Sequence, residues 1–132
     1  MCGFLVQFSK ENKNFQNFEL ANDLLEHRGP DSTKYIESKE NFKFGFKRLS
    51  ILDLDSSADQ PMVDSQKNYI IVFNGEIYNF NTLRSEIKNS GGKFLTSHSD
   101  TEAILEGYKI WGTDILNKLE GQFSFVIFDK VN

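Results

Sequence analysis

A phenylalanine at every second position over residues 42–46 constrains the fold more than any other feature of the sequence. Successive side chains of a strand point to opposite faces, so this pattern predicts a strand over 42–49 with one buried face. A second strand is predicted over 35–38, and the polar stretch 39–41 joins the two. This part of the chain is therefore expected to form an antiparallel pair of strands.

Further strands and helices are predicted along the rest of the chain. Short apolar runs indicate strands, and apolar residues three or four positions apart indicate helices. The pattern of strands flanked by helices, with hairpin-like pairs, predicts an α+β fold in layers with mostly antiparallel strands. The additional strands are predicted over 3–9, 69–73, 93–96 and 123–128, and the helices over 15–27, from 80 to about 90, and from 99 onward.

Local signals predict where these helices begin and end. Gly29-Pro30 is a typical helix stop, and Asn79 is a plausible N-cap. The run 99–102, Ser-Asp-Thr-Glu, fits a capping box in which the first and last side chains each accept a backbone N–H. The face of the first helix that is expected to be buried carries Phe18, Ala21 and Leu25.

Composition limits the classes of function. At 132 residues the length suits one domain, and we expect residues 1–132 to form it. The net charge of −4 argues against nucleic acid or an anionic membrane surface as a partner. One cysteine and two histidines are too few for an ordinary zinc site, and no metal ligands are predicted. Without a hydrophobic run of about 18 residues or a signal sequence, the expected location is the cytoplasm.

The single cysteine is Cys2, directly after the initiator methionine. Removal of Met1 would leave a residue that carries both a thiol and a free α-amine, with ordinary pKa values of about 8.5 and about 7.7–8. Nucleophile and general base would then belong to one residue, as in enzymes with an N-terminal threonine. The alternative is a small apolar side chain at a chain end without a chemical role.

A nucleophile that attacks an amide needs hydrogen-bond donors where negative charge develops. Asn74 and Gly75 follow the predicted strand 69–73 and offer a side-chain amide and a backbone N–H. The alternative is a hairpin turn, for which Asn-Gly is a common dipeptide. Because Glu76 and a predicted helix follow at once, a strand-to-helix passage fits better than a two-residue hairpin.

Three charged residues near predicted element ends could bind a small zwitterion. Arg48 could bind a carboxylate through two parallel hydrogen bonds, and Glu76 and Asp100 could hold an ammonium group. A ligand with an α-carboxylate, an α-amine and an amide to be cleaved is glutamine or asparagine. Each of these residues could instead be an ordinary solvated surface group.

Seven short motifs in order along the chain resemble those of one family. Each is weak alone, but together they are specific and cover nearly the whole chain. The chain resembles the class II glutamine amidotransferase domain of glutamine-hydrolysing asparagine synthetases. The motifs are Met1-Cys2-Gly3, His27-Arg28-Gly29-Pro30-Asp31, Arg48-Leu49-Ser50-Ile51, Gln60-Pro61-Met62, Asn74-Gly75-Glu76-Ile77-Tyr78-Asn79, Ser99-Asp100-Thr101-Glu102 and Gly121-Gln122-Phe123-Ser124-Phe125.

The resemblance implies an N-terminal nucleophile hydrolase fold, an αββα sandwich with antiparallel sheets. It implies that Cys2 is the nucleophile, that its free amine is the base, and that glutamine is hydrolysed to glutamate and ammonia through a thioester. The roles implied for other residues are an oxyanion hole from Asn74 and Gly75, α-carboxylate binding by Arg48, α-amine binding by Glu76 and Asp100, and a glutamine pocket that includes Leu49 and Ile51.

Members of this family usually continue into an ATP-using synthetase domain, so we expect this chain to be incomplete at its C-terminus. Ser90-Gly91-Gly92 lacks the Asp-Ser pair of a synthetase pyrophosphate loop. No cofactor is therefore expected in this domain, and ATP and magnesium are expected only in a synthetase domain that receives the ammonia in cis or in trans. The alternatives are a non-catalytic glutamine-binding or assembly module, an inactive fragment and a free-standing glutaminase.

Overall fold

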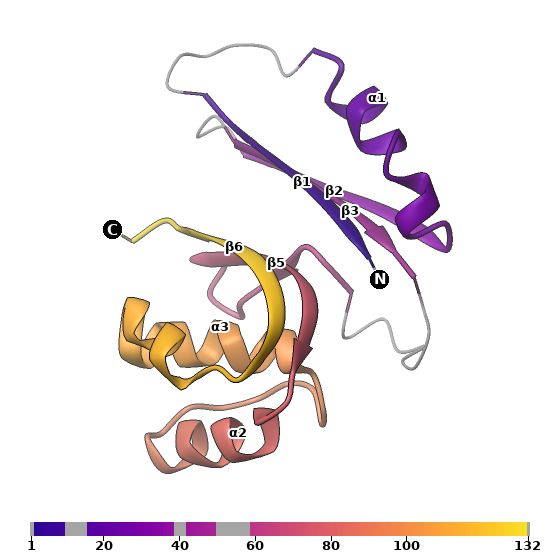
Figure 1. Cartoon of the computed structure of the whole chain (residues 1–132). Coiled ribbons are helices and arrows are strands. Elements are labelled where there is room, and N and C mark those ends of the chain that lie inside the picture. Colours follow the sequence, from indigo (N-terminus) through magenta and orange to yellow (C-terminus); the bar gives the residue numbers. More distant parts are fainter. Residues whose placement is uncertain (1, 10–15, 39–41, 50–58, 132) are drawn as a thin grey trace. The chain divides into compact units, whose positions relative to one another are not determined.

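The computed structural model describes residues 2–9, 16–38, 42–49 and 59–131. The chain divides into two compact units, Met1–Leu54 and Asp55–Asn132. Each unit contains a three-stranded antiparallel sheet with helices packed on it (Figure 1). This architecture confirms the α+β class and the antiparallel strands that the sequence predicts. No helix in the described ranges is long and apolar enough to cross a membrane.

The first unit is a sheet with a short helix on one face (Figure 1). Its strand order is β1-β3-β2. The alternating phenylalanines of β3 are buried, which confirms the predicted strand with a buried face. The elements are β1 (Gly3–Phe8), α1 (Phe18–Asp23), the 3-10 helix η1 (Glu26–Arg28), β2 (Ser32–Ser38) and β3 (Phe42–Arg48).

The first helix is shorter than predicted, and its buried face is different. α1 has only six residues, and Phe18 and Asn22 are its buried side chains, whereas Ala21 is exposed. The reason lies in β3, because Gly45 leaves a pit that the Asn22 side chain fills. From there the Asn22 amide donates to the hydroxyl oxygen of Tyr35 at 3.3 Å. Residues 10–15, where part of the predicted helix falls, lie outside the described ranges.

The second unit consists of a sheet, a helix on the sheet, and a further helix on that helix (Figure 1). The strand order is β4-β5-β6. Apolar side chains of β5 and α3 form one core cluster, and α2, α3 and η3 contribute to another. The elements are β4 (Met62–Val63), β5 (Tyr69–Ile77), α2 (Phe80–Asn89), α3 (Asp100–Trp111), the 3-10 helix η3 (Gly112–Lys118) and β6 (Gly121–Asp129).

The predicted strand over 93–96 and one half of the predicted capping box are wrong, for related reasons. Residues 93–96 do not form a strand, because the N–H groups of Leu95 and Thr96 donate to the Glu102 carboxylate at 2.6 and 2.9 Å. That use of Glu102 also leaves the capping box incomplete. Ser99 fulfils its part as N-cap by accepting from the Glu102 N–H at 3.2 Å.

Asn79 occupies the predicted N-cap position of α2, but its side chain does not cap the helix. Instead, its amide nitrogen donates to the carbonyl oxygen of Lys118 at 2.8 Å, and its amide oxygen accepts from the Glu120 N–H at 3.1 Å. Asn79 therefore fastens the end of β5 to the segment that leads into β6.

Candidate active site

Cys2 lies immediately before β1 and is half-buried. Its sulfur accepts from the N–H of Leu49 at 3.4 Å, and the thiol faces the Leu49 carbonyl oxygen at 3.8 Å. β1 and β3 run antiparallel, which brings the beginning of β1 next to the end of β3, where Leu49 follows. The sheet register thus fixes where the thiol lies.

Arg28 also contacts Cys2. It belongs to one of the sequence motifs, but no role was predicted for it. Its guanidinium donates to the carbonyl oxygen of Cys2 at 3.4 Å. Gly29 follows, and a Cβ at that position would collide with the carbonyl of Lys47, so the backbone of η1 approaches β3 closely. The Asp31 N–H then donates to the Arg48 carbonyl oxygen at 3.0 Å. The segment 27–31 therefore contacts both Cys2 and the end of β3, and it stabilises the position of one next to the other.

The predicted glutamine-binding residues of this unit lie at the end of β3. Arg48 is the last residue of that strand, which ends one residue before the predicted end, and Arg48 and Leu49 are both half-buried. Ile51 lies outside the described residues. The first unit therefore brings Cys2, Leu49 and the Arg48 backbone together.

Asn74 and Gly75 lie inside β5 and not at its tip, so the prediction of a strand that ends at Phe73 is wrong. They pair with Ser124 and Phe123 of β6, and the strand continues to Ile77. Gly75 has a φ of +152°, and a Cβ there would collide with the carbonyl oxygen of Gln122. Glycine thus permits the ladder to continue through the first four residues of the motif, as far as Ile77.

Asp100 begins α3 and lies at the edge of β5. Its carboxylate accepts from the N–H groups of Ile77 at 3.4 Å and Thr101 at 2.8 Å. Burial raises the pKa of Asp100, these hydrogen bonds oppose the shift, and the nearby charge of Glu76 adds to it. The combined negative charge of these two neighbouring carboxylates favours a bound cation.

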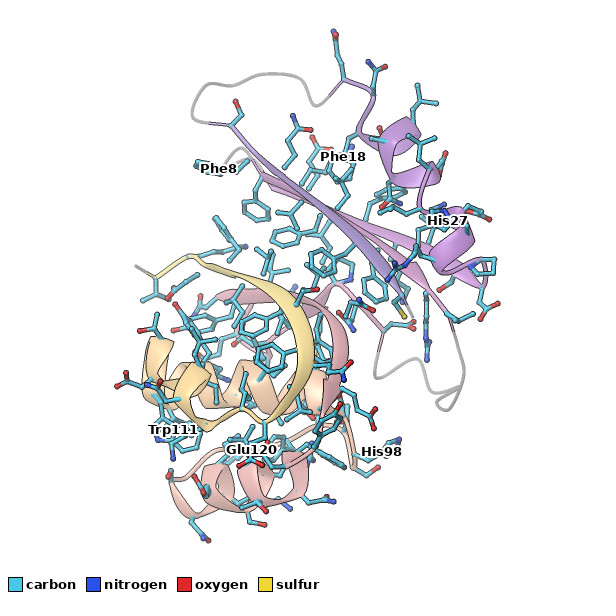
Figure 2. All side chains as sticks on the ribbon, viewed as in Figure 1. Phe8, Phe18, His27, His98, Trp111 and Glu120 are labelled. Carbon is cyan, nitrogen blue, oxygen red and sulfur yellow. The ribbon has the colours of Figure 1, made fainter. Side chains whose placement is uncertain are left out.

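The predicted site residues fall into two groups, one in each unit. Cys2, Arg48 and Leu49 belong to the first, and Asn74, Gly75, Glu76 and Asp100 belong to the second. The two histidines also lie in different units, His27 in η1 and His98 in the loop before α3 (Figure 2). Within the described ranges, no group of three or more His, Cys, Asp and Glu side chains could hold a metal ion.

A cavity of about 470 Å³ lies elsewhere in the second unit. Its walls come from the 62–66 segment, the 90–96 loop and the body of α3. None of the predicted site residues lines it.

Comparison with known proteins identifies the class and then the family. The structure is similar to that of a Bacillus subtilis glutamine phosphoribosylpyrophosphate amidotransferase, with a TM-score of 0.72 and 19% identity over 98% of this chain and 35% of the other. This likeness confirms the predicted N-terminal nucleophile hydrolase fold. A family model described as "Glutamine amidotransferase domain" matches residues 1–132, and the chain belongs to this family.

Curated relatives are similar over almost the whole chain. Asparagine synthetase [glutamine-hydrolyzing] 1 of Bacillus subtilis is 41% identical over 135 residues, which cover 98% of this chain and 21% of the relative. Asparagine synthetase [glutamine-hydrolyzing] 1 of Arabidopsis thaliana is 37% identical over 133 residues, which cover 98% of this chain and 22% of the relative. The chain thus spans about a fifth of the length of the curated relatives that it matches.

Proposed function

We propose that this chain is the glutaminase part of an asparagine-synthetase-type amidotransferase and hydrolyses glutamine to glutamate and ammonia. The observation that carries the proposal is the position of the Cys2 sulfur, half-buried and hydrogen-bonded to the Leu49 N–H beside Arg48. Membership of the glutamine amidotransferase family supports it.

In the proposed reaction, the α-amine of Cys2, freed by removal of Met1, takes the thiol proton as the sulfur attacks the side-chain amide carbon of glutamine. The carbonyl oxygen becomes an oxyanion, which the Asn74 side chain and the Gly75 N–H stabilise. The amine gives its proton to the departing nitrogen. Ammonia is then released, and a γ-glutamyl thioester remains on Cys2. Water then attacks the thioester, releases glutamate and restores the thiol.

The same proposal assigns the groups that hold glutamine. The Arg48 guanidinium binds the α-carboxylate, and Leu49 and Ile51 contribute to the pocket. Glu76 and Asp100 bind the α-ammonium group, which would relieve the repulsion between these neighbouring carboxylates.

The ammonia passes, in this proposal, to a synthetase domain in cis or in trans, with aspartate as the default acceptor. The large share of the curated relatives that this chain does not cover supports such a partner domain. Residues 1–132 form the amidotransferase domain and need no cofactor for hydrolysis, whereas ATP and magnesium serve the synthetase step. The cytoplasm is the proposed location.

Two measurements on the purified chain test the proposal. Intact mass should show loss of Met1, because a retained methionine acylates the amine of Cys2. Glutamate release from glutamine should then be observed and should fall to background in Cys2→Ala. Release that survives in the variant would remove Cys2 as nucleophile. A folded chain that has lost Met1 and still releases no glutamate would indicate a glutamine-binding module.

Acid pH should weaken glutamine binding through Asp100. Because the pKa of this carboxyl is raised, it loses its charge at a higher pH than an ordinary aspartate, and its attraction for the ammonium group is lost with that charge. KM for glutamine should rise as the pH falls through this raised pKa. In Asp100→Asn, KM should be high, and this step in its pH profile should be absent; an unchanged profile would contradict the assignment.

A further inference from the structure

Gln60 is a buried side chain with both ends of its amide in use. Its amide oxygen accepts from the N–H of Phe73 in β5 at 2.6 Å, and its amide nitrogen donates to the hydroxyl oxygen of Thr101 in α3 at 3.3 Å. Only 9% of the residue is exposed. Gln60 thus links the edge of β5 to the first turn of α3 within the second unit.

The hydrogen bonds along this edge of β5 follow the alternation of an antiparallel strand. Every second N–H points away from β6. The N–H groups of Phe73 and Ile77 do so, since they donate to the side chains of Gln60 and Asp100. Gly75 lies midway between them, so its N–H points to the same edge.

The two flanking acceptors are themselves connected. Asp100 and Thr101 are neighbours in the first turn of α3, and the Thr101 N–H donates to the Asp100 carboxylate. Gln60 reaches this turn through the Thr101 hydroxyl. The stretch from Phe73 to Ile77 is therefore held at both ends by one turn of helix, and the Gly75 N–H lies between the two attachments.

We propose that Gln60 is a positioning residue for the Gly75 N–H, which it directs at the developing oxyanion by fixing Phe73 two residues before it. The inference rests on the proposed glutaminase function. Gln60 touches no reacting atom in this role. Its effect lies in holding the donor in place before the reaction, so that no reorganisation is needed when charge develops.

Loss of the link should lower kcat without weakening glutamine binding. An absent oxyanion donor costs about a hundredfold to a thousandfold in kcat. In Gln60→Leu, the donor is displaced but still present, so we expect kcat to fall about tenfold to a hundredfold while KM stays within about threefold. Thr101→Val keeps the shape of the side chain and removes only the far end of the link, so a smaller fall in kcat is expected. Gln66→Leu, on the exposed hairpin before β5, is the matched control and should keep both constants.

A readout specific to the oxyanion separates positioning from general damage. The Cys2 sulfur adds to the carbonyl carbon of an aldehyde analogue of glutamine, the α-amine takes the thiol proton, and the carbonyl oxygen becomes a hemithioacetal oxyanion that faces the Gly75 N–H. In the parent chain, the amide proton of Gly75 should shift downfield in NMR spectra when the aldehyde binds. In Gln60→Leu, this shift should shrink, and aldehyde affinity should fall by about the same factor as kcat.

Each outcome decides between the inference and the function on which it rests. A parent chain without Cys2-dependent turnover overturns both. A parent that turns over, with Gln60→Leu unchanged in kcat and aldehyde affinity, overturns only the positioning role. A variant that loses thermal stability but keeps kcat per folded molecule also overturns it, because Gln60 would then be structural alone.

Discussion

The two helix–sheet contacts of this chain differ in the chemistry of their interface. In the first unit, the face of the sheet beneath α1 carries two lysines of β3, Lys43 and Lys47, whose side chains are almost fully buried. Lys43 pairs with Glu19 of α1 and Glu37 of β2. Lys47 pairs with carboxylates at the end of α1 and in η1, at 2.9 and 2.7 Å.

In the second unit, the contact between α3 and its sheet is apolar, and charge lies at the beginning of the helix. Ile71, Phe73 and Ile77 of β5 meet Ile104 and Leu105 of α3 in one buried cluster. At the beginning of α3, the guanidinium of Arg84 from α2 lies 3.7 Å from the Glu102 carboxylate and donates to the carbonyl oxygen of Ser99.

The difference teaches where a charge is essential to the fold. The partners of Lys43 and Lys47 are more than half exposed, with side-chain exposures of 54–60%. Each lysine has two of them, so loss of one carboxylate leaves the lysine paired with the other. Arg84 and Glu102 are 7% and 6% exposed. Loss of either one leaves the other charged and buried without its partner, which is strongly destabilising.

The largest effect should come from Glu102→Ala. This change leaves Arg84 buried without its partner and removes the acceptor of the Leu95 and Thr96 N–H groups. We expect a loss of about 3–5 kcal/mol in the free energy of unfolding, measured in denaturant. Glu86→Ala is the control, because Glu86 pairs with Lys118 at the surface and should cost at most about 1 kcal/mol. If both variants lost a similar amount of unfolding free energy, buried and surface ion pairs would not differ in their contribution to stability.

A smaller effect is expected at the α1 interface from Gly45→Ala. The new Cβ would lie 2.7 Å from the Asn22 side-chain oxygen and 3.0 Å from the ring of Phe18. Overpacking of this kind costs about 1–3 kcal/mol. Among the described residues, the Asn22 side-chain oxygen has no hydrogen-bond partner, so Asn22→Ala should relieve most of the clash in the double variant. If the losses of unfolding free energy in the two single variants simply added in the double variant, the steric contact would not be the cause of the destabilisation by Gly45→Ala.

The sequence predicted the parts of this contrast that depend on local patterns. The alternating phenylalanines placed β3, and the Ser99 cap placed the beginning of α3, because strand faces and helix caps are set by residues close in sequence. The motifs also placed Cys2, Arg48 and Asp100 at or near element ends, as the structure does.

The parts that failed depend on contacts between residues far apart in sequence. Asn22 is buried because Gly45, 23 positions later, leaves room for it, and no helical periodicity encodes that. Likewise, Asn74 and Gly75 were expected at a strand tip, but pairing with β6 keeps them inside β5. The link from Gln60 to Thr101 spans 41 residues and was equally invisible to local patterns.

The smallest effect is expected from acid pH. Acidification also tests most directly whether the exposed carboxylates that pair with Lys43 contribute to the stability of α1. The bond from Lys43 lowers the pKa of Glu19, so this pair stabilises α1 above the ordinary glutamate value of 4.5 and is lost as the pH falls through the lowered pKa. Asp100, with its raised pKa, has the opposite sign, because its protonation on acidification favours the folded form. Amide exchange from pH 6 downward, corrected for intrinsic rates, should therefore show protection falling a few-fold in α1 before it falls in α3. Glu19→Gln should lower α1 protection at pH 6 and flatten its pH dependence, although Glu37 still faces Lys43. If α3 loses protection first, the acid-sensitive contact is the apolar one, and screening does not explain the contrast between the two units.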